Sequence, residues 1–157
     1  MKVTFLGTGT STGIPTIGVE RESCLSSDKR DNRLRSSILI EYKSKSILID
    51  CGPDFRQQML RINKTKVDAI FFTHEHADHT AGLDDIRPIS FHHGKIPIYA
   101  HQRVVDNLKN RFDYLFDKKG DYPGSPHVYP NIINEGEIFK YEDCLLYTSD
   151  AADESVS

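Results

Sequence analysis

The feature that most constrains this chain is a cluster of metal-binding residue types in residues 71–82, FFTHEHADHTAG. Three histidines and one aspartate fall within six positions of this stretch: His74, His76, Asp78 and His79. They directly follow the apolar run 69–72, which predicts a short buried strand. A strand that ends in such a cluster delivers it to the rim of a sheet, where open α/β folds place their sites. The pattern favours a metal site over a histidine-rich surface loop.

The spacing of the cluster predicts two ions. On extended backbone, side chains two positions apart point the same way, so His74 and His76 can hold one ion as a pair. Asp78 and His79 follow where the chain turns. Four such groups cannot all bind one tetrahedral ion and leave it open to a substrate, so we expect two divalent ions roughly 3.5–4 Å apart. Neutral imidazole suits zinc, manganese or iron, and we expect zinc or manganese.

Residues 73–79, followed by Thr-Ala-Gly-Leu at 80–83, resemble the His-x-His-x-Asp-His motif of the metallo-β-lactamase-fold hydrolases. Amidohydrolases also carry a His-x-His pair, but they need a barrel of about 250 residues, and this chain has 157. A His-Glu-x-x-His zincin helix is excluded because the second histidine follows two residues after the first. The resemblance implies a mixed α/β (α+β) fold, the first half of an αββα metallo-β-lactamase sandwich.

The start of the chain narrows the resemblance to one branch of these enzymes. A predicted strand at 3–6 leads into the glycine-rich loop 7–13, which lacks the Gly-Lys-Ser/Thr of a phosphate loop. We interpret it as a tight loop that lets the backbone approach the site or its ligand. Its Phe-Leu-Gly-Thr-Gly opening is similar to that of the phosphodiesterase-like branch. That branch includes phosphoribosyl cyclic phosphate phosphodiesterases and tRNA 3′-processing ribonucleases.

The resemblance implies a hydrolase that cleaves a small, linear or cyclic, phosphodiester through a hydroxide activated by two metal ions. It assigns the metal ligands to the four residues of the cluster, and Asp78 also acts as the catalytic residue that steers the hydroxide. Asp50 ends a predicted strand, and the resemblance gives it the supporting role of orienting the site's loops. From the residues alone, Asp50 is explained as a turn or helix-capping residue, and this interpretation is compatible with the supporting role.

The polar loop 18–36 is the place where relatives carry the three cysteines of a structural zinc site. Here only Cys24 remains, and one thiol cannot hold zinc, so we predict no structural metal in this loop. The loop also contains a group of basic residues, which favours a solvated surface over phosphate contact because aspartates are interleaved. These basic residues are Lys29, Arg30, Arg33 and Arg35.

Further elements follow from hydrophobic periodicity and from glycine and proline positions. Pro97 favours an edge or strand-start position for its strand. The predicted elements are an antiparallel hairpin at 37–42 and 46–50, a helix opened by Pro53, a strand at 67–72, a short helix at 82–88 that Pro88 breaks, a strand at 96–99, a helix at 101–116 and a strand at 137–141.

Composition limits the function classes. The net charge of −3 provides no global field for nucleic acid, so RNA is the less favoured substrate. No apolar run reaches the ~20 residues of a membrane span. Three irregularly spaced cysteines do not form a disulfide framework, which predicts a reducing, cytoplasmic setting. The expected partner is a small phosphodiester, and a homodimer is allowed. A tRNA 3′-processing endoribonuclease and a non-catalytic metal-binding or scaffold protein are the alternatives.

The last residues change character. Residues 144–157 contain no lysine or arginine, show neither helical nor strand periodicity, and resemble a translated sequencing adapter. We therefore expect a partial metallo-β-lactamase-fold domain at 1–143 and a non-native tail at 144–157. In intact relatives the remaining metal ligands lie further along the chain, so the cluster supplies two ligands per ion. We expect weak metal binding and little activity from the chain as it stands, because catalytic zinc normally has three protein ligands.

Overall fold

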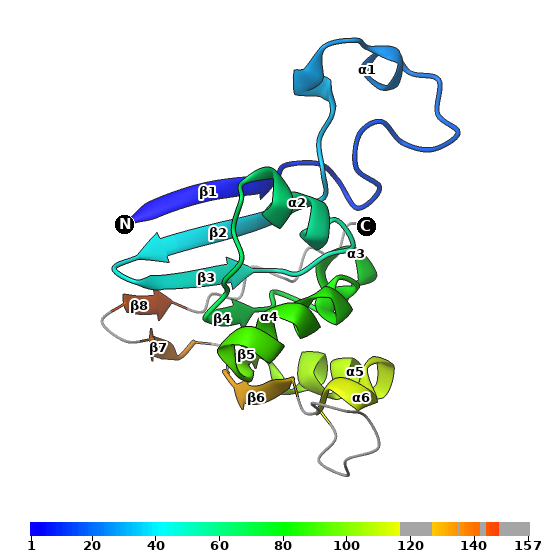
Figure 1. Cartoon of the computed structure of the whole chain (residues 1–157). Helices are drawn as coiled ribbons and strands as arrows, with labels where there is room; N and C mark the ends of the chain where they lie inside the picture. Colours follow the sequence, from blue (N-terminus) through cyan, green and yellow to red (C-terminus); the bar gives the residue numbers. More distant parts are fainter. Residues whose placement is uncertain (117–126, 135, 142–143, 148–157) are drawn as a thin grey trace.

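The computed structural model describes residues 1–116, 127–134, 136–141 and 144–147. A six-stranded mixed sheet lies at its centre, in the order β1-β2-β3-β4-β5-β6 (Figure 1). The first three strands pair antiparallel and the last three join in parallel. The strands are β1 (Lys2–Gly7), β2 (Ser37–Tyr42), β3 (Lys45–Ile49), β4 (Ala69–Phe71), β5 (Ile96–Ala100) and β6 (Val128–Ile132).

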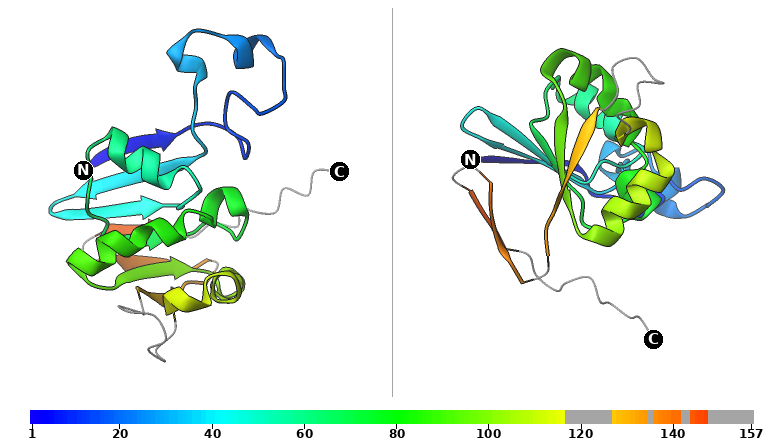
Figure 2. Two further views of the ribbon diagram at one scale, coloured as in Figure 1. Left: turned by 45° about the vertical axis from the view of Figure 1, so that its right-hand side comes forward. Right: turned by 90° about the horizontal axis from the view of Figure 1, so that it is seen from below.

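One face of the sheet is covered by helices (Figure 2). Leu39, Leu48, Ile70 and Ile98 lie side by side on neighbouring strands, so they share this face, and each is fully buried. They pack in the main core against apolar residues of the helices. The longer helices are α2 (Phe55–Arg61), α4 (Arg87–His93) and α5 (Gln102–Arg111), and the four-residue helix α6 (Asp113–Phe116) follows α5.

The opposite face carries a second, smaller core. Phe71 stacks on Tyr99 with ring centroids 4.5 Å apart, and Tyr141 meets Phe71 edge-on. Tyr141 belongs to β7 (Ile138–Tyr141), which pairs antiparallel with β8 (Cys144–Tyr147). This hairpin lies on the side away from the helices (Figure 2). The layers are therefore helix, sheet and the hairpin of a second sheet, which confirms the predicted mixed α/β class.

Short elements complete the chain, and one of them corrects a prediction. Pro88 was expected to break a helix at 82–88, but it lies in the first turn of α4. A proline is tolerated there because the first amides of a helix have no intrahelical partner. The short elements are α1 (Glu22–Leu25), η1 (Lys29–Asp31), α3 (Ala77–Thr80) and η2 (Leu83–Ile86).

Two further predictions need correction. Pro97 lies in β5, which has β4 and β6 on its two sides, so the expected edge position is wrong. Pro97 is the second residue of β5 and precedes the residues that pair with β4, so the expected strand-start position is right. The helix expected at 101–116 ends at Arg111, and Phe112 has non-helical backbone angles before α6 begins.

The described residues contain no helix with the length and apolar character needed to cross a bilayer. The predicted domain boundary at residue 143 falls outside the described residues, and β8 at Cys144–Tyr147 pairs with β7. The division into 1–143 and 144–157 stays a prediction.

Candidate metal centre

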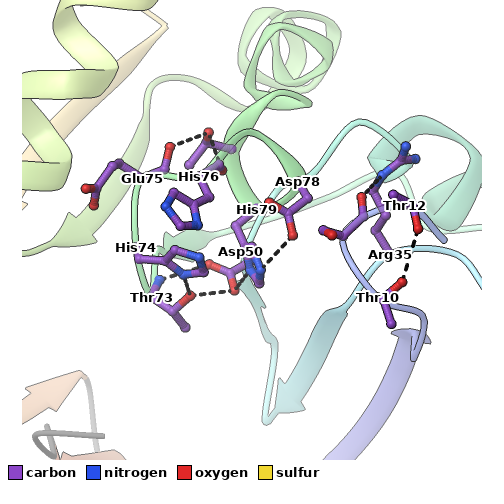
Figure 3. Close-up of polar contacts among 12 residues, drawn as sticks. Thr10, Thr12, Arg35, Asp50, Thr73, His74, Glu75, His76, Asp78 and His79 are labelled. Carbon is purple, nitrogen blue, oxygen red and sulfur yellow. Dashed lines mark hydrogen bonds and ion pairs between the residues drawn. The ribbon is translucent and has the colours of Figure 1, made fainter. Parts of the chain in front are cut away.

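The predicted metal ligands lie at the rim of the sheet, where two parallel strands end. Asp50 follows β3 directly, and the loop 73–76 with helix α3 follows β4. We call residues 73–82 the metal loop. Figure 3 shows the side chains of His74, His76 and His79 gathered around this rim with Asp50 between His74 and His79. The strand-to-rim arrangement predicted from the sequence is observed.

Close backbone packing fixes the metal loop against the segment after β3. The amide of Cys51 donates to the carbonyl of His79 over 2.8 Å, and the amide of Gly82 donates to the carbonyl of Cys51 over 2.9 Å. A Cβ on Gly52 would lie 2.0 Å from the Asp78 carbonyl oxygen, and one on Gly82 would lie 1.9 Å from the Gly52 carbonyl oxygen. Only glycine permits this approach at either position.

Asp50 connects both parts of the metal loop. Its carboxylate is buried, with Oδ1 accepting from the Thr73 amide over 2.9 Å and Oδ2 accepting from the Thr73 hydroxyl over 2.8 Å. Oδ2 also lies 2.7 Å from His79 Nδ1. Because a carboxylate only accepts, Nδ1 of His79 carries the proton and Nε2 has the lone pair. A histidine held this way presents Nε2 to a metal.

The Asp78–His79 pair has the separation that a shared ion requires. Asp78 Oδ2 lies 3.2 Å from His79 Nε2. Two ligands on one tetrahedral ion, each bonded at about 2.1 Å, are about 3.4 Å apart. The donor set, one imidazole and one carboxylate, also suits a divalent ion. These two residues therefore fit one half of the predicted site.

The His74–His76 pair is less completely arranged. Nδ1 of His74 lies 2.9 Å from the Thr73 hydroxyl, which uses its hydrogen for Asp50, so His74 donates there and its Nε2 has the lone pair. The ring of His74 lies 4.7 Å from that of His76 and 4.1 Å from that of His79. Within the described part of the chain, no three His, Cys, Asp or Glu side chains form a group ready to hold an ion.

The surroundings of His79 and His74 shift the pKa values of these two histidines in opposite directions. The hydrogen bond that His79 donates to Asp50 raises the pKa of His79 above its usual 6.5. Burial, followed by the neighbouring charge of His79, lowers the pKa of His74 below that value. A metal must displace any proton on these rings, because imidazole binds metal in its neutral form.

Two arginines of α5 contact the outer side of the metal loop. Arg111 donates to the carbonyl of Glu75 over 3.2 Å and to the hydroxyl of Thr80 over 2.9 Å. Thr80 is fully buried and its hydroxyl donates to the carbonyl of His76 over 2.9 Å. Arg103 lies 3.3 Å from a carboxylate oxygen of Glu75. Sequence reasoning missed both arginines because nothing in the local pattern links a helix at 102–111 to a loop thirty residues earlier.

The other candidates from the sequence have structural contacts. Arg35 forms an ion pair with Asp54 at 3.0 Å. Gly7 and Gly9 approach the backbone of residues 33–35, so the glycine-rich loop packs against the chain itself. The Sγ atom of Cys24 accepts from the Thr16 amide over 3.4 Å.

Comparison with known proteins identifies relatives that are longer than this chain. The family described as "Beta-lactamase superfamily domain" matches residues 45–152. An octanoyltransferase of Porphyromonas gingivalis is 47% identical over 127 residues, which cover 80% of this chain and 25% of that protein. A ribonuclease Z of Methanococcus maripaludis is 29% identical over 153 residues, covering 90% of this chain and 44% of that protein.

A solved structure matches more fully. It is described as a new diphosphatase from the PhnP family, and it is 41% identical with a TM-score of 0.81. The match covers 91% of this chain and 54% of that one. This chain thus spans between a quarter and about half of the length of these relatives.

Proposed function

The chain belongs to the beta-lactamase superfamily domain family, whose fold it shares, and on this premise we propose that it is part of a metal-dependent hydrolase of small phosphodiesters. One observation carries the proposal. Asp78 and His79 are as far apart as two ligands of one ion, and Nε2 of His79 keeps its lone pair because Nδ1 donates its proton to Asp50. The likeness to a PhnP-family diphosphatase supports a phosphorus–oxygen bond as the target.

The proposal assigns one ion to His74 and His76 and a second to Asp78 and His79. Bound divalent ions would supply a nucleophilic water at neutral pH and offset charge on the phosphoryl oxygens. Asp50 keeps the proton on Nδ1 of His79 and, through Thr73, on Nδ1 of His74. The carboxylate of Asp78, 20% exposed, would also orient the attacking water. Zinc and manganese are the two ions we propose.

A tRNA 3′-processing endoribonuclease is the second candidate. The likeness to a ribonuclease Z supports it, whereas the net charge of −3 favours a small substrate over a polyanion. A non-catalytic metal-binding or scaffold protein is the candidate from another class. It predicts metal binding without any hydrolysis.

The test measures hydrolysis by this chain and by the protein that the longest open reading frame containing it encodes. Each protein is assayed with Zn²⁺, Mn²⁺ or EDTA. The substrates are bis(p-nitrophenyl) phosphate, a ribose cyclic phosphate and precursor tRNA. We expect the longer protein to cleave the small phosphodiesters with metal, and His79→Ala to abolish cleavage. Cleavage of precursor tRNA alone would favour the ribonuclease. Metal binding with no cleavage of any substrate would support the scaffold and overturn the hydrolase.

A further inference from the structure

We propose that Thr80 is a positioning residue of the predicted metal centre, because its hydroxyl fixes the corner of the metal loop between the two predicted ligand pairs. The corner lies at His76, whose backbone is extended with φ −60° and ψ 149°, and helix α3 begins at the next residue. One ligand pair precedes α3 and the other lies within it. The corner therefore sets how the two pairs face each other. The inference rests on the proposed function, since it gives Thr80 a role toward the metal site.

The hydroxyl of Thr80 forms hydrogen bonds across this corner. The residue is fully buried, and a buried hydroxyl is costly unless it is hydrogen-bonded. It donates to the carbonyl of His76 over 2.9 Å and lies 3.3 Å from the carbonyl of Glu75. A threonine on a helix reaches the carbonyl four residues earlier in this way. Because Thr80 ends α3 and both carbonyls precede it, the hydroxyl ties the helix to the extended segment before it.

Arg111 on α5 fixes the direction of this hydroxyl. Its Nη1 atom donates to Thr80 Oγ1 over 2.9 Å and to the carbonyl of Glu75 over 3.2 Å. A guanidinium only donates, so the hydroxyl of Thr80 accepts from Arg111 and directs its own hydrogen to the loop carbonyls. A hydrogen bond from a charged donor is stronger than one between neutral groups. One nitrogen of α5 thus binds both sides of the corner.

The substitution Thr80→Val isolates the contribution of the hydroxyl. Valine keeps the branched shape of threonine, so the packing of the buried site is preserved. The carbonyl of His76 still accepts from the amide of His79 over 3.1 Å, and Arg111 still donates to the carbonyl of Glu75. Neither group is left without a partner, which would add a separate cost. A change in the variant therefore reports the lost link across the corner.

The first measurement is hydrogen exchange at residues 74–80 of the full, metal-free chain in EDTA. We expect exchange to be about two- to tenfold faster in Thr80→Val, the size of one lost hydrogen bond. Thr80→Ser keeps the hydroxyl and should exchange like the wild type. The control is Ser90→Ala, which removes a buried hydroxyl that donates to the carbonyl of Arg87 on α4. It should leave exchange at residues 74–80 unchanged. Equal exchange in Thr80→Val and the wild type would overturn the role of the hydroxyl.

The second measurement tests the effect on metal binding. Competition with a chromophoric chelator should show that Thr80→Val binds Zn²⁺ about three- to fivefold more weakly, because part of the lost hydrogen bond must be offset when the ligands are ordered. Thr80→Ser and Ser90→Ala should bind like the wild type. With Co²⁺ in place of Zn²⁺, the visible spectrum reports the arrangement of the ligands, and it should change in Thr80→Val but not in Thr80→Ser.

The outcomes separate this inference from the proposed function. A wild-type chain that binds Zn²⁺, with the same affinity and the same Co²⁺ spectrum in Thr80→Val, would overturn the positioning role and leave the hydrolase proposal intact. Equal losses of Zn²⁺ affinity in Thr80→Val and Ser90→Ala would show that lower stability, not the corner, weakens binding, and would also overturn it. A wild-type chain that binds neither metal would overturn the metal site itself, and the role of Thr80 toward it.

Discussion

The metal loop has a first half, residues 73–76, and a second half, residues 77–82. The two halves make different numbers of contacts with the rest of the protein. In the second half, the ring of His79 is bonded to Asp50 and faces Asp78, while its backbone is bonded to Cys51. In the first half, His74 is held only through Thr73, and His76 is exposed, with its ring against that of His74. The motif gives the four predicted ligands equal weight, but the structure holds the Asp-His pair with more contacts than the two histidines.

The difference follows from where each half lies. The second half packs over Gly52, so its backbone is fixed by contacts with the segment after β3. The first half is an extended segment that α5 contacts through Arg103 and Arg111, and the rings of its two histidines lie beside each other near Asp50 (Figure 3). A ligand that is already held loses less entropy on binding, so the prepared pair should dominate metal affinity. Four experiments test this ranking, from the largest effect to the smallest.

Loss of a ligand from the prepared half should have the largest effect. We expect His79→Ala to lower zinc affinity by more than about 100-fold, beyond the range for second-sphere changes. We expect His76→Ala to lower it by about tenfold, because this ring has no anchor to lose. Competition with a chromophoric chelator measures both affinities. Equal losses in the two variants would show that the halves contribute alike.

Asp50→Asn should have the next largest effect, because this residue connects the halves. Asparagine keeps the size and tolerates the positive φ of 60° at this position. Its amide cannot accept every hydrogen bond that the carboxylate accepts from Thr73 and His79. We expect zinc affinity to fall by about 10- to 100-fold and stability by about 1–3 kcal/mol.

Chelator competition and urea unfolding measure these two effects of Asp50→Asn. The control is Asp106→Asn, which changes an exposed carboxylate on α5. An Asp50→Asn protein with wild-type affinity and stability would contradict the connecting role.

The sequence predicts the position of the four-residue cluster well and the contacts that support it poorly. The strand before His74 and the turn after Asp50 follow from local patterns of apolar and polar residues, which adjacent positions specify. The contacts of Thr73 and Arg111 depend on how distant elements pack, and no local period encodes that. The same limit explains Pro97, whose central position is decided by the pairing of β5 on both sides.

Arg111→Met should have a moderate effect on the first half of the loop. It removes the donor to the Glu75 carbonyl and to the buried Thr80 hydroxyl, while methionine keeps most of the apolar stem. We expect a loss of about 1–2 kcal/mol in stability and a small loss in zinc affinity. Arg103→Met removes a more exposed ion pair with Glu75, and we expect at most about 0.5 kcal/mol.

Urea unfolding of the two arginine variants, with hydrogen exchange at residues 74–80, separates these outcomes. Faster exchange in Arg111→Met but not in Arg103→Met is expected. Identical behaviour of the two variants would show that α5 holds the loop by general packing instead of these hydrogen bonds.

The smallest effect, a pH dependence, distinguishes the halves by its sign. The pKa of His79 is raised by Asp50, so its contribution to stability is fully present below pH 6.5 and is lost as the pH rises through the raised pKa. The pKa of His74 is lowered by burial, so the folded state resists its protonation and loses stability as the pH falls below 6.5.

Unfolding free energies of the metal-free chain in EDTA, measured from pH 5 to 8.5, test these opposite signs. Subtracting the His79→Gln curve from the wild-type curve should give a difference that declines as the pH rises. The same subtraction for His74→Gln should give a difference that increases as the pH rises. His93→Gln, on the exposed end of α4, controls for the loss of a surface imidazole. Two differences of the same sign would mean that Asp50 does not distinguish the halves, and the ranking of the two ligand pairs would lose its electrostatic basis.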